Sequence, residues 1–366
     1  MNFLTSRAAA LSPPPPAPAA PARADAARLN LNECPLPPSP RALEAAAAAF
    51  AGVNRYTLQG PDALTRALSA RTGVPGSRIV LTAGSDLVLQ YCAAITLEPG
   101  RACVFPRPSF PRYRLATAIT GARAVPVMVT EDGRNDVPAM LAAITPDTSL
   151  VFVCSPNGNT GGMLDEAELV ALAKGVPDHA LLCVDEAYAE FARHVGGPDA
   201  LAVMQAHRTG PWVVSRTFSK AYALAGARVG YGLCSSTEIA VAINAVRPTF
   251  EVSGPSVAAA AAALEDEAHL KHILDVTAQG VGQLSDGFLA LGFSPWPSFA
   301  NFVAADIGTA VEPVLARMAE AGVLARGFRE PGAFETALRI SVGTAAENAS
   351  AIAALGAAIS ASKAAA

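Results

Sequence analysis

The chain has 366 residues, of which 51% are hydrophobic and 16% charged, so it is long and apolar enough to bury a full core. Its formal net charge is -4 and it carries no dense run of lysine and arginine, which argues against a nucleic-acid-binding protein. No apolar stretch reaches the ~18 to 20 residues that a membrane span needs. The six cysteines form no Cys-x-x-Cys pair and the histidines have no metal-ligand spacing, so we expect buried free thiols in the cytoplasm and no metal site.

The N-terminal segment 1–28 is rich in alanine and proline, with four consecutive prolines at positions 13–16. Proline at this density favours extended chain without a core, so we predict a disordered tail. A secretory signal is disfavoured, because prolines interrupt the apolar stretch and only one early arginine is present. From residue 29 the composition changes, and we predict an ordered arm that leads into a helix capped by Ser39 and ending near Phe50.

A second helix is predicted to open at Pro61-Asp62, and seven apolar runs rich in β-formers follow it. The predicted strands are 79–81, 102–105, 124–129, 150–154, 180–184, 211–214 and 229–233. The predicted helices between them include 86–97, 109–120, 165–174 and 198–207. Continuous apolar strands that alternate with helices predict an α/β fold with a mainly parallel sheet covered by helices on both faces.

After residue 244 the pattern changes to long helices, predicted at 256–264 and 269–291. Strands are predicted near 301–305, 323–326 and 338–342. We therefore predict a large domain from 51 to 244 and a smaller α+β domain from 245 to 366, which the arm and helix at 29–50 join.

Polar residues follow the ends of several predicted strands, where parallel sheets bind ligands. Lys220 is the one lysine of four that follows a run of hydroxyl residues, Thr217 and Ser219, and Arg228 lies eight residues further on. A lysine amine can bond covalently to an aldehyde, while hydroxyls and a guanidinium can bind a phosphate. This stretch therefore predicts a site for a phosphorylated aldehyde.

Three other strand ends have both a functional and an ordinary interpretation. Asp185 could keep a ring nitrogen protonated, or simply cap a helix. Asn157 lies in a Pro-Asn-Gly turn and could also donate to a phenolate oxygen. The backbone amides of Ser85 and Asp86 form either a phosphate site or a plain helix start.

Two further residues stand out by their surroundings. Phe110 could stack on a flat ring or belong to the core. Arg339 lies in an apolar strand, so its guanidinium needs an anion, which a substrate carboxylate or a protein carboxylate would supply. The one approximate Gly-x-Gly motif, at 280–285, falls inside a predicted helix and does not indicate a nicotinamide site.

These motifs together resemble the class I/II pyridoxal-phosphate aminotransferases of fold type I, and most closely the histidinol-phosphate aminotransferase group. The resemblance runs from about residue 29 to the C-terminus. It is carried by Arg-Thr-Phe-Ser-Lys-Ala at 216–221, Ala-Gly-Ala-Arg-Val-Gly at 225–230, Asp-Glu-Ala-Tyr at 185–188 and Leu-Arg-Ile-Ser-Val-Gly-Thr at 338–344.

The resemblance implies pyridoxal phosphate as cofactor, a seven-stranded sheet in the large domain, and ping-pong amino transfer from an amino donor to 2-oxoglutarate. It also implies a homodimer with its active sites at the subunit interface. Lys220 would hold the cofactor covalently and Asp185 would pair with its ring nitrogen, while Asn157 and Tyr188 would contact its ring hydroxyl.

The remaining implied roles concern the phosphate, the ring face and the substrate. The phosphate would lie on Ser85, Asp86, Thr217, Ser219 and Arg228, and on Tyr56 from the partner subunit. Phe110 would stack on the ring, Arg339 would bind the substrate carboxylate, and Arg326 would bind a substrate phosphate.

Departures from the family pattern leave the substrate open. Phe110 stands where tyrosine is usual, and Glu251 stands where an asparagine is usual near the substrate, so we count Glu251 among the substrate-binding candidates. A decarboxylase of the phosphothreonine type and an aromatic amino acid aminotransferase are alternatives. A cofactor-binding module without turnover is disfavoured, because a binder does not need the electron sink.

Overall fold

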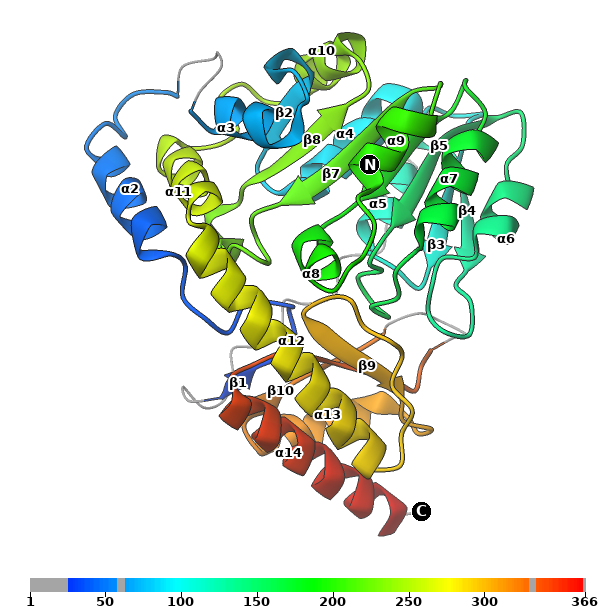
Figure 1. Ribbon diagram of the computed structural model, residues 1–366. Helices are drawn as coiled ribbons and strands as arrows, with labels where there is room; N and C mark the ends of the chain where they lie inside the picture. Colours follow the sequence, from blue (N-terminus) through cyan, green and yellow to red (C-terminus); the bar gives the residue numbers. More distant parts are fainter. Residues whose placement is uncertain (1–25, 58–62, 329–333, 365–366) are drawn as a thin grey trace, which may run out of the picture.

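The computed structural model describes residues 26–57, 63–328 and 334–364, which form a large lobe and a small lobe. The long helix α12 (Glu267–Ala290) runs from the large lobe along the small lobe (Figure 1). The predicted start of the second helix at Pro61-Asp62 lies outside the described residues, and α3 is described from Ala63 to Thr72.

The large lobe contains a seven-stranded sheet of order β2-β8-β7-β6-β5-β3-β4. Its strands are β2 (Ile79–Thr82), β3 (Ala102–Arg107), β4 (Arg123–Met128), β5 (Thr148–Cys154), β6 (Leu181–Asp185), β7 (Trp212–Thr217) and β8 (Gly230–Cys234). β8 pairs antiparallel with both of its neighbours, and the other pairs are parallel. The predicted α/β fold with a mainly parallel sheet is confirmed.

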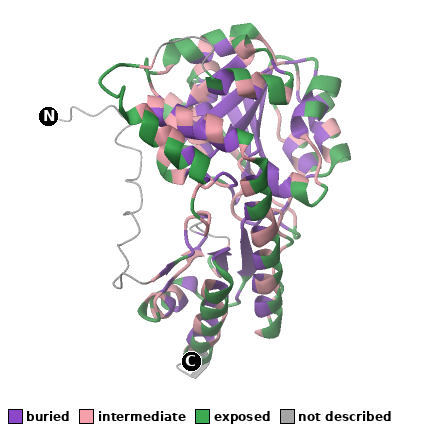
Figure 2. Ribbon diagram, turned by 60° about the vertical axis from the view of Figure 1, so that its left-hand side comes forward, coloured by how far each residue is buried: buried purple, intermediate pink, exposed green. Residues whose placement is uncertain are grey.

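Helices cover both faces of this sheet, and Figure 2 shows its central strands buried between them, whereas the edge strand β4 is largely exposed. The helices are α4 (Ser85–Thr96), α5 (Arg112–Thr120), α6 (Val137–Ala142), α7 (Glu166–Gly175), α8 (Ala189–His194), α9 (Ala200–His207) and α10 (Thr237–Val246). Successive β5 side chains enter different core clusters: Leu150 and Phe152 pack with α4 and α5, and Val151 and Val153 with α7 and α9. Burial of both faces explains why these strands are continuously apolar in sequence.

The small lobe has an antiparallel sheet of β11 (Arg326–Gly327), β12 (Ala337–Ser341) and β9 (Phe302–Asp306). Helices α13 (Val311–Glu320) and α14 (Ala345–Ala364) contribute apolar side chains to its core. A separate two-stranded sheet pairs β1 (Ala27–Arg28) with β10 (Val323–Leu324). Residues 27 and 28 therefore belong to the small lobe rather than to the unpacked tail in which the sequence prediction placed them, because they form strand hydrogen bonds.

The segment that precedes α12 packs with the large lobe. α11 (Gly254–Glu265) lies against α2 (Pro40–Phe50), and the core cluster of the large lobe includes Leu270 and Ile273 of α12 as well as Ala300 and Phe302. The predicted division at residue 245 therefore does not coincide with the division between the two cores. No described helix has the length and apolarity to cross a membrane.

Candidate active site

A cavity of about 410 Å³ lies where the strand ends of the large lobe meet the arm and the small lobe. The carboxyl ends of β5, β6 and β7 and the start of α4 contribute to its wall, as does β12 of the small lobe. Its charged, hydroxyl and aromatic lining residues are Glu33, Ser85, Asp86, Phe110, Asp185, Tyr188, Thr217, Ser219, Lys220, Arg228, Arg326, Phe328 and Arg339. Eleven of the fourteen predicted site residues thus come together at the ligand-binding edge of the sheet.

Lys220 reaches the cavity from the turn after β7. Its Nζ donates hydrogen bonds to the backbone carbonyl oxygens of Leu31, at 3.1 Å, and Asn32, at 2.9 Å. Burial, followed by the neighbouring charge of Arg339, lowers the pKa of Lys220 to about 8, although Glu33 opposes the shift. The Lys220 amine therefore loses its proton, and becomes nucleophilic, at a lower pH than a free lysine amine does.

We expect this lowered pKa to appear in chemical labelling of the cofactor-free protein. An aldehyde with a mild hydride donor modifies only uncharged amines, so the labelling rate of Lys220 should level off above pH about 8. A free lysine amine, with a pKa of about 10.4, should continue to react faster as the pH rises further. Mass spectrometry of the lysine peptides measures both rates, and a Lys220 rate that rises in parallel with the free amine would contradict the prediction.

Asp185 ends β6 and presents a free carboxylate oxygen within the buried wall. The Tyr113 hydroxyl donates to its Oδ2 at 2.7 Å, whereas Oδ1 has no hydrogen-bond partner. Burial raises the pKa of Asp185 to about 6, and the Tyr113 hydrogen bond opposes this rise. A buried acceptor without a partner fits the protonated ring nitrogen of the cofactor that the resemblance implies.

Tyr113 is a functional candidate that the sequence analysis missed. Its side chain is fully buried on α5, and its ring stacks on Phe152 with centroids 4.8 Å apart. It occurs three residues after Phe110, one helical turn away, but nothing in the sequence indicated that its hydroxyl would meet Asp185.

Asn32 is a second residue that the sequence analysis did not single out. Its Nδ2 donates to the hydroxyl oxygen of Tyr188 at 2.8 Å, and its backbone carbonyl accepts from Lys220. The predicted residue Asn157 is completely buried, and its side chain holds the backbone: Nδ2 donates to the Pro108 carbonyl at 3.0 Å and Oδ1 accepts from the Asn159 amide at 2.9 Å. Asn157 therefore shapes the turn and does not line the cavity.

The expected phosphate-binding groups lie together at the start of α4. Arg228 donates to Asp86 Oδ1 at 3.0 Å and to the Ser219 hydroxyl at 3.5 Å, and Ser219 accepts from Thr217 at 2.9 Å. Gly84, with φ +94°, precedes Ser85, and a Cβ there would lie 2.2 Å from the Arg228 guanidinium. A helix start beside a guanidinium and hydroxyls is the arrangement that binds a phosphate dianion.

Two arginines line the small-lobe side of the cavity. Arg326 and Arg339 are opposite each other in the β11–β12 pair. Arg339 donates to the carbonyl oxygens of Gly158, at 2.7 Å, and Asn30, at 3.3 Å, and its Nε has no hydrogen-bond partner. Burial, opposed by Tyr188 and reinforced by Arg326, lowers the pKa of Arg339 to about 10. The pair forms a cationic surface for anionic substrate groups.

The other predicted residues differ in their distance from the cavity. Phe110 lines it and is 40% exposed, so its face is available to a ring. Tyr56 is 77% exposed and stacks on Phe250, with centroids 4.6 Å apart, outside the cavity. Glu251 accepts a hydrogen bond from the Ala83 amide at 2.9 Å and is likewise absent from the cavity lining.

Comparison with known proteins is consistent with this geometry. The family model described as aminotransferase class I and II matches residues 24–355. The chain is 39% identical to histidinol-phosphate aminotransferase 2 of Pseudomonas fluorescens over 321 residues, which cover 88% of this chain and 85% of that protein. It is 37% identical over 324 residues to histidinol-phosphate aminotransferase of Moorella thermoacetica, with 88% and 83% covered.

A solved structure is similar along nearly the whole chain. The crystal structure of histidinol-phosphate aminotransferase from Sinorhizobium meliloti in complex with pyridoxal-5'-phosphate superimposes with a TM-score of 0.89. The two chains are 30% identical, and the match covers 99% of this chain and 98% of that one.

The fold and the family match define the class: this chain belongs to the class I and II aminotransferases. Within that class it is a pyridoxal-phosphate-dependent aminotransferase of the histidinol-phosphate type, acting on an amino donor and a keto acid. The predicted family, activity and cofactor are thus confirmed.

Proposed function

We propose that this enzyme transfers the amino group of histidinol phosphate to 2-oxoglutarate, a step of L-histidine biosynthesis. The adjacent guanidinium groups of Arg326 and Arg339 in the cavity carry this proposal. A phosphate on one substrate and the carboxylates of the other both need such cationic partners, and a ping-pong enzyme accommodates the two substrates in turn. The names of the relatives support the same substrate.

The proposed roles of the site residues follow from their chemistry. Pyridoxal phosphate, when bound, supplies the electron sink for the substrate's α-carbon. Lys220 Nζ would hold the cofactor covalently, and its free amine would move the proton at that carbon. Asp185 Oδ1 holds the ring nitrogen protonated, and Tyr188 with Asn32 contacts the ring hydroxyl.

Binding and orientation are assigned to other groups. The amides of Ser85 and Asp86, with Thr217, Ser219 and Arg228, hold the phosphate. Phe110 covers one face of the ring. Asn157, which the resemblance places beside the ring hydroxyl, is assigned the indirect role of holding the turn that carries Gly158.

We also propose a cytoplasmic homodimer in which Tyr56 reaches the phosphate of the partner subunit's site. Tyr56 and Phe250 form an exposed aromatic pair, and Phe50 and Val53 are also exposed nearby in sequence. Exposed apolar side chains gathered in this way favour contact with another protein surface.

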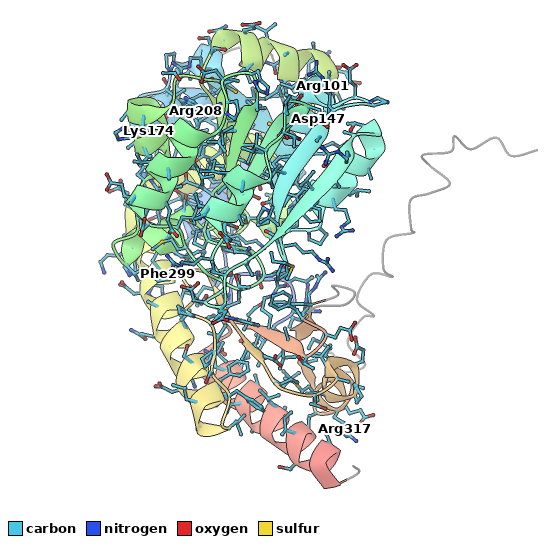
Figure 3. The ribbon with its side chains drawn as sticks, turned by 90° about the vertical axis from the view of Figure 1, so that its right-hand side faces the viewer. Arg101, Asp147, Lys174, Arg208, Phe299 and Arg317 are labelled. Carbon is cyan, nitrogen blue, oxygen red and sulfur yellow. The ribbon has the colours of Figure 1, made fainter. Side chains whose placement is uncertain are left out.

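The substrate assignment predicts a selective effect of Arg326→Gln. Loss of one charge-assisted contact to a phosphate should lower kcat/KM for histidinol phosphate by about tenfold to a hundredfold. Histidinol, which lacks the phosphate, should be used equally well by both proteins. Arg101→Gln is a matched control, since Arg101 lies at the far end of the large lobe (Figure 3).

Steady-state assays with 2-oxoglutarate as acceptor measure these ratios. Equal losses for histidinol phosphate and histidinol would show that Arg326 does not recognise the phosphate. Release of carbon dioxide from an amino acid, without transfer of its amino group, would instead favour a decarboxylase.

A further inference from the structure

The turn between β2 and α4, residues 82–85, is fixed from two sides. On its inner side, the Ala83 carbonyl oxygen accepts from Arg228 at 3.3 Å, and the Thr82 hydroxyl donates to the Gly84 carbonyl at 2.9 Å. The next amides, of Ser85 and Asp86, open α4 at the proposed phosphate site. The position of this turn therefore determines where the phosphate-binding amides point.

The second side is held by the connector between α10 and α11. Glu251 Oε1 accepts the Ala83 N–H at 2.9 Å, and Arg247 donates to the Leu81 carbonyl oxygen at 3.1 Å. Ala83 is thus held by both of its backbone polar groups, one bonded to Glu251 and the other to Arg228.

The Glu251 side chain is buried for a carboxylate. It is 5% exposed, its Oε2 has no hydrogen-bond partner, and the nearest Arg247 nitrogen lies 4.0 Å away. Burial raises the pKa of Glu251, and the carboxylate in turn adds to the burial effect that raises the pKa of Tyr91 to about 12. A buried carboxylate that lies beside Tyr91 and accepts a 2.9 Å bond from the Ala83 amide holds that amide in place.

We propose that Glu251 is a positioning residue for the cofactor phosphate, acting through the Ala83 amide on the turn that precedes α4. This role replaces the substrate contact that the sequence suggested for Glu251. It rests on the proposed phosphate site, and it does not depend on which amino donor the enzyme uses.

The test compares two ligands on the cofactor-free protein: pyridoxal phosphate and pyridoxal, which lacks the phosphate. Glu251→Ala leaves the partly buried Ala83 N–H without its acceptor, so we expect the dissociation constant of the variant for pyridoxal phosphate to rise about tenfold. Its affinity for pyridoxal should stay unchanged, because the phosphate site is then empty in both proteins.

Glu251→Gln is the rescue variant. Its amide oxygen can still accept from Ala83 and no longer places a negative charge near a phosphate, so it should bind pyridoxal phosphate at least as tightly as the unsubstituted protein. Glu238→Ala, on the exposed face of α10, is the matched control and should change neither affinity.

Three results would overturn the proposal. Affinity for pyridoxal phosphate could be unchanged in Glu251→Ala, both ligands could lose affinity by the same factor, or Glu251→Gln could behave as Glu251→Ala does. Arg228→Gln tests the phosphate site separately: if it fails to reduce the preference for pyridoxal phosphate, the site assignment is at fault. No amino substrate enters any of these measurements, so they remain interpretable if histidinol phosphate is not the donor.

Discussion

Lys220→Ala should abolish turnover and the visible absorbance of the lysine-bound cofactor. The alanine variant lacks both the amine that bonds to the cofactor and the group that moves the substrate proton. Proton transfer by a positioned side chain alone contributes about 10²- to 10⁴-fold to a rate, so we expect kcat to fall by at least that factor. Absorbance spectra and steady-state assays of purified protein measure the two effects.

The chain offers a clear control for this experiment. Lys174, near the end of α7, is exposed on the outside of the large lobe (Figure 3). Lys174→Ala should retain both the absorbance and the activity. If Lys220→Ala kept its turnover, the covalent role would belong to another lysine.

Asp185→Asn should leave the cofactor attached to Lys220 but reduce kcat by about 10²- to 10³-fold, the effect typical of losing one preorganised electrostatic contact. Asparagine has nearly the same shape as aspartate and cannot keep the ring nitrogen protonated by charge. Cofactor absorbance and kcat, measured on the same preparation, separate retention from turnover. Wild-type kcat in Asp185→Asn would remove Asp185 from the mechanism.

Tyr113→Phe should change the pH dependence of cofactor binding, because it alters the pKa of the same carboxylate. The Tyr113 hydrogen bond holds the pKa of Asp185 down against burial, so its removal should raise that pKa above about 6. The charged carboxylate binds the protonated ring nitrogen. As the pH is lowered, cofactor affinity should therefore begin to fall at a higher pH in Tyr113→Phe than in the unsubstituted protein. Titrations of the cofactor-free proteins at several pH values measure this shift, and identical pH profiles would contradict it.

The sheet was predictable because its strands, apart from the exposed edge strand β4, are mostly buried on both faces. Runs such as 150–154 and 180–184 are continuously apolar, and they appear as β5 and β6 with only small differences in length. Some helices whose sequences lack a clear amphipathic pattern were not predicted. α14 contains ten alanines among its twenty residues, so it has a high helix propensity but no clear amphipathic pattern.

The site residues that could be predicted are those whose reactive or charged side chain lies next to, or within, an apolar strand. Lys220, Asp185 and Arg339 each follow or interrupt an apolar strand, which is visible in sequence. Contacts between distant segments were not visible. Asn32 meets Tyr188 across 156 positions, and Glu251 meets Ala83 across 168, so only the folded chain shows these pairs.

The most direct test of the proposed activity is a single half-reaction. The holoenzyme, mixed with histidinol phosphate in the absence of any keto acid, should lose the absorbance of its lysine-bound cofactor, yield the keto product in stoichiometric amount and retain the cofactor in its aminated form. Addition of 2-oxoglutarate should then restore the original spectrum and produce glutamate. An unchanged spectrum with histidinol phosphate, together with a full response to another amino donor, would contradict the substrate assignment.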